Sequence, residues 1–167
     1  MMRQDTGRGI LRLAATVFLL GWMAVIFWFS AQPASDSSRL SEFVAHQVAE
    51  VFYQGASDLQ LEQLAARLDY PIRKAAHMTE YAILGVLFVP VIGGKRPNGW
   101  RTFLWAFVSA VCYAMTDELH QVFVPGRSGQ ASDVCVDAVG VLFGLLVLFL
   151  IQKLWRKHCE KRGHPVK

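Results

Sequence analysis

Four apolar runs constrain the fold of this chain more than any other feature of its sequence. The first, 13–29, holds no charged residue and with its flanks reaches the roughly 20 residues that a membrane-spanning helix requires. Three further runs are too short to cross a hydrocarbon core about 30 Å thick at 1.5 Å per residue: 81–92, 103–115 and 138–151. Each becomes long enough only when it includes its polar neighbour, 71–80, 116–124 or 132–137. The sequence therefore predicts an all-α, polytopic membrane protein with four transmembrane helices, three of them polar at one end.

The composition agrees with this interpretation. Hydrophobic residues make up 53% of the 167 residues and charged residues only 18%. A single soluble domain of this length would carry more charge on its surface.

The distribution of basic residues predicts the topology. Lysine and arginine gather in three clusters: Arg3, Arg8 and Arg12; Lys95, Arg96 and Arg101; and Lys153, Arg156, Lys157, Lys161, Arg162 and Lys167. The positive-inside rule places all three in the cytoplasm. Both termini are then cytoplasmic, and the net charge of +4 reflects topology, with no footprint for nucleic acid. We expect a cytoplasmic start at 1–12, a membrane domain at 13–151 and a basic cytoplasmic tail at 152–167.

The extracytoplasmic segment 31–71 predicts two amphipathic helices between the first and second spans. Apolar residues recur at helical spacing up to a stop at Gly55: Leu40, Phe43, Val44, Val48, Val51 and Phe52. Ser57 and Gln60 form a capping box that opens the second helix. Span two then begins with Pro71 in its first turn. The two helices are expected either to lie on the membrane surface or cap the bundle, or merely to connect the spans.

Polar side chains form a stripe on each of the last three spans. The stripes contain Arg73, His77 and Glu80 with Lys74 beside them, then Asp117, His120 and Gln121, then Asp133 and Asp137 followed by Gly140 and Gly144. Glu118 points about 100° away from Asp117, which predicts different partners for these two acids. Ionisable residues inside spans are costly and by default mark a functional site. All three polar ends face the same side, so we predict one outward-facing cavity that gathers His77, Glu80, Asp117, His120, Arg127, Asp133 and Asp137.

Several short motifs resemble the VanZ-like family of bacterial membrane proteins. They are Phe29-Ser30-Ala31-Gln32 with Ser37-Ser38, Arg73-Lys74-x-x-His77-x-x-Glu80-Tyr81, Asp117-Glu118-x-His120-Gln121-x-Phe123-x-Pro125-x-Arg127, and Asp133-x-x-x-Asp137-x-x-Gly140. The resemblance covers roughly residues 20 to 150. It implies a protein of the bacterial cytoplasmic membrane with a cell-envelope role, in a family linked to teicoplanin resistance.

Three functions are compatible with the cluster. In the first, basic groups bind an anionic lipid headgroup, a lipid-carried phosphate or a glycopeptide while acids orient them, using Arg73, Lys74, Gln121, Arg127, Asp133 and Asp137. In the second, a hydrolase or transferase acts on an outer-leaflet lipid, and its candidate catalytic residues, which are also the candidate ligands of a divalent metal, are His77, Glu80, Asp117 and His120. In the third, a structural polar network fixes the register of the helices. The expected partners are membrane lipids and a cell-wall precursor or glycopeptide.

Overall fold

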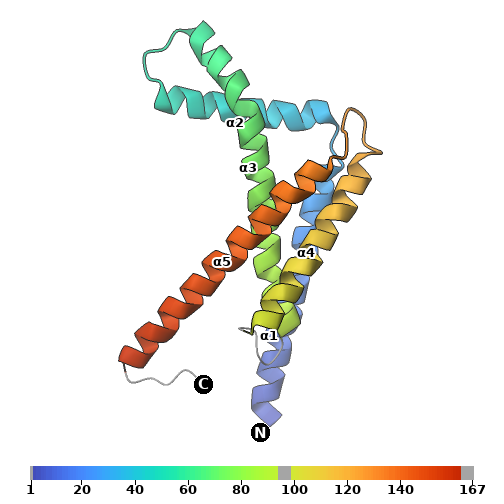
Figure 1. The fold of residues 1–167 in the computed structure, drawn as a ribbon, viewed down its shortest axis with the longest axis vertical. Coiled ribbons are helices and arrows are strands. Elements are labelled where there is room, and N and C mark those ends of the chain that lie inside the picture. Colours follow the sequence, from blue (N-terminus) through green and yellow to red (C-terminus); the bar gives the residue numbers. More distant parts are fainter. Residues whose placement is uncertain (1, 94–98, 163–167) are drawn as a thin grey trace.

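The computed structural model describes residues 2–93 and 99–162, and these fold into five α-helices without a strand (Figure 1). The helices are α1 (Met2–Ser30), α2 (Ala34–Phe52), α3 (Asp58–Gly93), α4 (Trp100–Gln121) and α5 (Ala131–Lys161). The all-α prediction is confirmed. The basic residues Lys95, Arg96 and Lys167 lie outside the described residues.

Three of the helices are long and apolar enough to cross a membrane. They are the Gly9–Ser30 part of α1, the whole of α3 and the whole of α5. α4 is not among them, because it ends in a polar segment that includes Asp117, Glu118 and His120. The structure thus supports three of the four predicted spans by length and composition.

α3 is one continuous helix of 36 residues, with Pro71 in its interior. The prediction of two helices separated before Pro71 is therefore wrong. Proline removes one hydrogen bond from a helix interior, but Asp69 and Arg73 pair across this position at 2.6 Å. The helix also packs against α2 here. At 1.5 Å per residue α3 is about 54 Å long, which exceeds the hydrocarbon thickness of a bilayer.

α2 buries a different face from the apolar one that its sequence suggests. Its buried residues are the small side chains Ser41, Ala45 and Ala49, which are spaced four apart and allow close contact with α3. The large apolar side chains predicted as its face are mostly exposed, namely Leu40, Phe43, Val44, Val51 and Phe52. Close contact with α3 therefore places the small residues of α2, and not the large apolar ones, in the interface.

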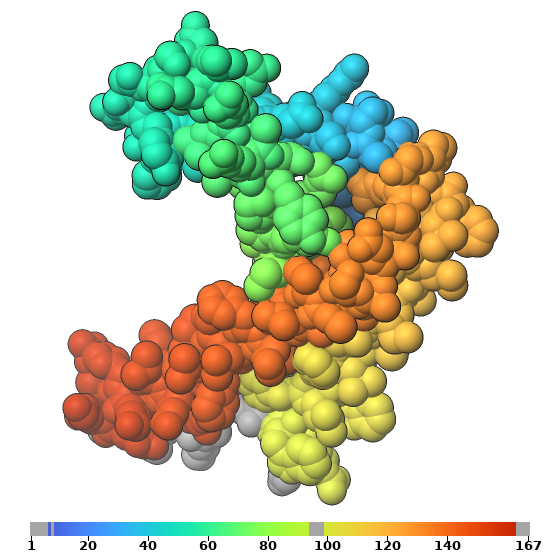
Figure 2. Space-filling view, turned by 45° about the horizontal axis from the view of Figure 1, so that its top comes forward, coloured from blue at the N-terminus to red at the C-terminus, as the bar shows by residue number. Residues whose placement is uncertain are grey.

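The predicted capping box is confirmed. The backbone N–H of Ser57 donates to the Gln60 side-chain oxygen at 2.9 Å, one half of a capping box at the start of α3. Gly126 has a φ of +76° in the turn that joins α4 to α5. This turn lies against the start of α2, where Ala34 N–H donates to the Pro125 carbonyl at 3.3 Å. In Figure 2 the contact is visible where the blue and orange surfaces meet.

The α3–α5 contact forms the closest packing of the bundle. A Cβ atom at Gly140 would overlap the backbone of Met78, and one at Gly144 would overlap that of Ala82. Around this contact lies the core, which consists of Leu19, Ile26, Tyr81, Leu84, Val89, Ala106, Ala110, Ala114, Val141 and Leu145. α4 packs against both α3 and α5. The contact therefore brings the polar stripes of α3, α4 and α5 together at one end.

Candidate functional site

The polar end of the bundle is the end where α1 and α4 finish and where α2 and α5 begin (Figure 1). α3 passes through it near its middle, so its polar stripe lies beside the polar residues of α4 and α5. Two neighbouring cavities open there.

The main cavity has a volume of about 310 Å³ and is amphipathic. Its charged and titratable lining residues are Asp36 from α2, Arg73, His77 and Glu80 from α3, Asp117 from α4, and Arg127 from the α4–α5 turn. Its apolar wall comes from the end of α1, from α2 and from α3, with Ile26, Phe29, Leu40, Val44 and Ile72. One side of the cavity therefore offers charge and the other hydrocarbon.

The side cavity has a volume of about 150 Å³ and lies next to the main one. Lys74, Gln121 and Asp133 line it, and it shares four residues with the main cavity: Ser37, Arg73, His77 and Arg127. The two arginines thus stand on the boundary between the cavities.

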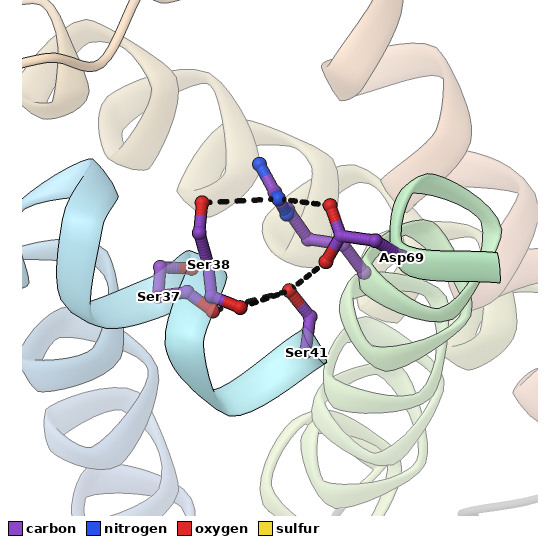
Figure 3. A network of polar contacts seen from close by, with 5 residues as sticks. Ser37, Ser38, Ser41 and Asp69 are labelled. Carbon is purple, nitrogen blue, oxygen red and sulfur yellow. Dashed lines mark hydrogen bonds and ion pairs between the residues drawn. The ribbon is translucent and has the colours of Figure 1, made fainter. Parts of the chain in front are cut away.

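A polar network between α2 and α3 holds Arg73 in place. Its guanidinium donates to Asp69 Oδ2 at 2.6 Å and to Ser38 Oγ at 3.2 Å. The Ser41 hydroxyl donates to the other carboxylate oxygen of Asp69. Figure 3 shows Ser41 of α2 joined to Asp69 on α3, and Ser38 of α2 joined to the guanidinium that pairs with Asp69. The polar stripes predicted from the sequence do not include Asp69, although its spacing of four from Arg73 is the signal that identifies the pair.

Arg127 differs from Arg73 because it has no ion-pair partner among the described residues. Its Nη2 donates to the backbone carbonyl of Phe29 at 3.2 Å, and none of the salt bridges within residues 2–93 and 99–162 includes it. Burial lowers the pKa of Arg127, and the nearby Asp117 carboxylate raises it. A partly buried guanidinium without a direct carboxylate partner is suited to accept an anionic ligand.

The remaining polar contacts fix the walls of the cavities. Lys74 Nζ pairs with Asp133 Oδ1 at 2.5 Å and so ties α3 to the start of α5. Gln121 Nε2 donates to Asp117 Oδ2 at 3.2 Å. Glu118 instead accepts the backbone N–H of Gln130 at 2.9 Å. The prediction that Asp117 and Glu118 have different partners is confirmed.

Two predicted residues, His120 and Asp137, line neither cavity. The His120 ring stacks on Phe27 with ring centroids 4.6 Å apart. Asp137 is only 1% exposed, and neither carboxylate oxygen has a hydrogen-bond partner within the described part of the chain. The predicted single cavity is wrong for these two residues, because the tight α3–α5 contact buries Asp137 below the cavities. The other five residues of that prediction line one or both cavities.

The described residues contain no group of three or more His, Cys, Asp or Glu side chains that could hold a metal ion. His77 and Glu80 do lie near each other, with Nδ1 and Oε2 4.0 Å apart. His120, stacked on Phe27, lines neither cavity. The geometry therefore does not assemble the predicted metal-ligand set of His77, Glu80, Asp117 and His120.

Comparison with known proteins gives one match. The family model described as VanZ/LLP1 matches residues 15–152, which is more than half of the chain. No curated protein and no solved structure matches the chain.

Proposed function

Because the chain belongs to the VanZ/LLP1 family, we propose that it is a cell-envelope protein of the bacterial cytoplasmic membrane whose polar end binds the anionic headgroup of a lipid or lipid-carried precursor. In this proposal it contributes to glycopeptide resistance of the teicoplanin type, as the resemblance to VanZ-like proteins suggests. The observation that carries the proposal is the guanidinium of Arg127, which has no ion-pair partner among the described residues and stands on the boundary between the amphipathic main cavity and the side cavity.

Arg73 and Arg127 support an anionic ligand. Asp69 and Ser38 already hold Arg73 in one orientation, so binding costs little side-chain entropy there. Arg127 has no carboxylate within ion-pairing distance in the described chain, and its planar fork can donate two parallel hydrogen bonds to a phosphate or carboxylate. Arg73 thus provides a donor group in a fixed orientation, and Arg127 provides a donor group that is available to an anionic ligand.

The apolar wall supports a lipid over a soluble anion. Ile26, Phe29, Leu40, Val44 and Ile72 would exclude water from one side of the main cavity and accommodate a hydrocarbon chain. Glu80 and Asp117 line the same cavity. When they are ionised, their carboxylates accept hydrogen bonds and cannot donate them. These acids favour a headgroup that carries hydroxyl or ammonium groups beside its phosphate.

The proposal includes four spans with both termini in the cytoplasm. α4 has 22 residues, so it is about 33 Å long and can cross the hydrocarbon core. The start of α1, the end of α3, the start of α4 and the end of α5 lie at the end of the molecule away from the cavities (Figure 1). Labelling of a cysteine at position 62 only from the cytoplasmic side would contradict this topology.

The test of the proposed function uses Arg127 variants in an expressing bacterial host. The wild-type protein is expected to lower the teicoplanin susceptibility of the host. Arg127→Ala is expected to remove this protection while the protein accumulates normally in the membrane. Arg127→Lys is expected to be substantially impaired as well, because lysine keeps the charge but loses the fork. Arg39→Ala is the matched control, since Arg39 is exposed on α2 and lines neither cavity. Full resistance in the Arg127→Ala strain at normal expression would exclude the ligand-clamp role.

A membrane-embedded hydrolase or transferase is the second candidate, because His77, Glu80 and Asp117 line the same cavity as the two arginines. A histidine and a carboxylate side by side could exchange a proton with a bound lipid. Incubation of the reconstituted protein with labelled phospholipid separates the two candidates. New products that disappear in His77→Gln support the enzyme, and bound but unchanged lipid supports the binding protein.

A further inference from the structure

The surface of α2 is divided into three sectors along its length. The first sector is buried against α3 and contains Ser41, Ala45 and Ala49. The exposed remainder separates by chemistry. One side, here called the apolar sector, contains Leu40, Phe43, Val44 and Val51. A neighbouring side, the charged sector, contains Arg39, Glu42, His46 and Glu50.

Successive residues are rotated by about 100° on a helix, so the three sectors follow one another around α2 at roughly 120° intervals, with Phe43 next to Glu50 and Gln47 within the apolar sector. Two residues of the charged sector contact each other, since His46 Nδ1 and Glu50 Oε1 are 3.2 Å apart. Nothing in the described chain covers the apolar sector, whose residues Phe43 and Val51 are 64% and 65% exposed. α2 therefore presents hydrocarbon on one side and charge on the other.

The position of α2 determines which way each sector faces. Figure 1 shows α2 running crosswise to α1 and α3 at the polar end of the bundle. Leu40 and Val44 line the main cavity together with Ile26 and Phe29 of α1. The apolar sector therefore faces toward the membrane-spanning part of α1, and the charged sector faces away from it.

The length and composition of α3 on each side of this crossing agree with this orientation of α2. The network of Ser38, Ser41 and Asp69 marks where α2 crosses α3. From Arg73 to Gly93 the helix rises about 30 Å, which matches the hydrocarbon thickness of a bilayer. The part of α3 before the crossing carries Asp58, Glu62 and Arg67, so it is compatible with an aqueous environment. α2 thus lies at the level where the hydrocarbon would end.

We propose that α2 is an interfacial helix and that the lipid bilayer covers its apolar sector. Helices of this kind lie in the plane of the interface with their apolar face buried about 5–10 Å into the boundary between headgroups and acyl chains. The apolar sector is also continuous with exposed apolar side chains at the end of α1, including Trp28 and Phe29. A bilayer covers both surfaces at once, whereas a soluble partner would cover only one.

The position of α2 also determines how a ligand with a hydrocarbon chain would reach the main cavity. Leu40 and Val44 belong both to the apolar sector and to the wall of the main cavity. The bilayer that covers this sector therefore borders the cavity. A ligand with a hydrocarbon chain enters laterally from the same leaflet.

Fluorescence quenching at single cysteines on α2 tests this inference. The full chain, with its three natural cysteines at 112, 135 and 159 replaced by serine, is reconstituted in phosphatidylcholine and phosphatidylglycerol vesicles. A bimane label is placed at Phe43→Cys or Val51→Cys in the apolar sector, and at Glu42→Cys or His46→Cys as matched controls on the same helix. Monodisperse elution in detergent confirms that each variant is folded.

Labels at positions 43 and 51 are expected to lose most of their fluorescence to lipids that carry a nitroxide near the headgroup and little to aqueous iodide. Labels at 42 and 46 are expected to show the reverse. Equal iodide quenching at all four positions would overturn the inference. Protection at 43 and 51 that disappears on dilution to one protein per vesicle would also overturn it, because a second copy of the chain would then be the cover.

Discussion

Two layers of polar groups at the same end of the molecule differ in their burial and in their hydrogen bonding. The rim layer, comprising the pairs Asp69–Arg73 and Lys74–Asp133 and the contact of Glu118 with Gln130, has short contacts of 2.5 to 2.9 Å. The deep layer, comprising Tyr81, Asp117 and Asp137, is almost completely buried. Among the described residues, its Tyr81 hydroxyl, one Asp117 oxygen and both Asp137 oxygens have no hydrogen-bond partner.

The two layers should therefore contribute differently to the stability of the fold. The Lys74–Asp133 pair ties α3 to α5, and the contacts of Asp69 with Ser41 and of Arg73 with Ser38 tie α3 to α2. Losing one member of such a pair leaves the other uncompensated. Burying a carboxylate without a partner costs free energy. A chain selected only for a stable polar network would not retain the deep layer in this form. We therefore expect substitutions in the rim to destabilise the fold and neutral substitutions in the deep layer to leave it intact.

The largest effect is expected at the helix contact beneath both layers. Gly140→Ala introduces a Cβ atom that overlaps the Met78 backbone, so it should separate α5 from α3 and cost about 3 kcal/mol. Gly21→Ala in α1 is the matched control, because a Cβ there meets no atom within 4 Å and alanine gains up to about 1 kcal/mol in a helix. Thermal unfolding in detergent measures both. Equal midpoints for the two variants would contradict the close contact.

A smaller loss is expected in the rim. Asp133→Ala removes the partner of Lys74 and should cost about 2 kcal/mol, less than for a fully buried pair because the two side chains are 18% and 24% exposed. The double variant Lys74→Met with Asp133→Leu should recover most of the loss, since neither charge is then left alone. Thermal midpoints of the wild type, Lys74→Met, Asp133→Leu and the double variant form a double-mutant cycle. Additive losses would show that the pair does not stabilise the helices.

The smallest effect on stability is expected in the deep layer. Asp137→Asn replaces a buried carboxylate that has no basic partner with a neutral side chain of the same size. The change in unfolding free energy should be below about 1 kcal/mol, or stabilising, because no ion pair is broken. Membrane accumulation and the thermal midpoint measure it. A loss as large as that of Asp133→Ala would remove the distinction between the two layers.

The sequence predicts the parts of this structure that depend on local chemistry. Helical class, the Ser57 capping box and the divergent partners of Asp117 and Glu118 follow from residue type and helical periodicity. The continuity of α3 through Pro71 does not, because it depends on the Asp69–Arg73 pair and on packing against α2.

Helix faces and depths are also tertiary properties. On α2 the sequence favours the face with the largest apolar area, whereas contact with α3 selects Ser41, Ala45 and Ala49. Asp137 shares a stripe with Asp133 one turn earlier, but the neighbouring Gly140 contact buries it below the cavities. Periodicity places both acids on one face and gives no measure of how closely the helices approach.

Native mass spectrometry of the protein purified in mild detergent tests the central claim, that Arg127 holds an anionic lipid at the polar end. The wild-type protein is expected to retain one phosphate-bearing lipid, and Arg127→Ala to lose it while Arg39→Ala retains it. A wild-type protein that carries no such lipid when anionic phospholipid is supplied, or an Arg127→Ala protein that retains it equally, would contradict the account.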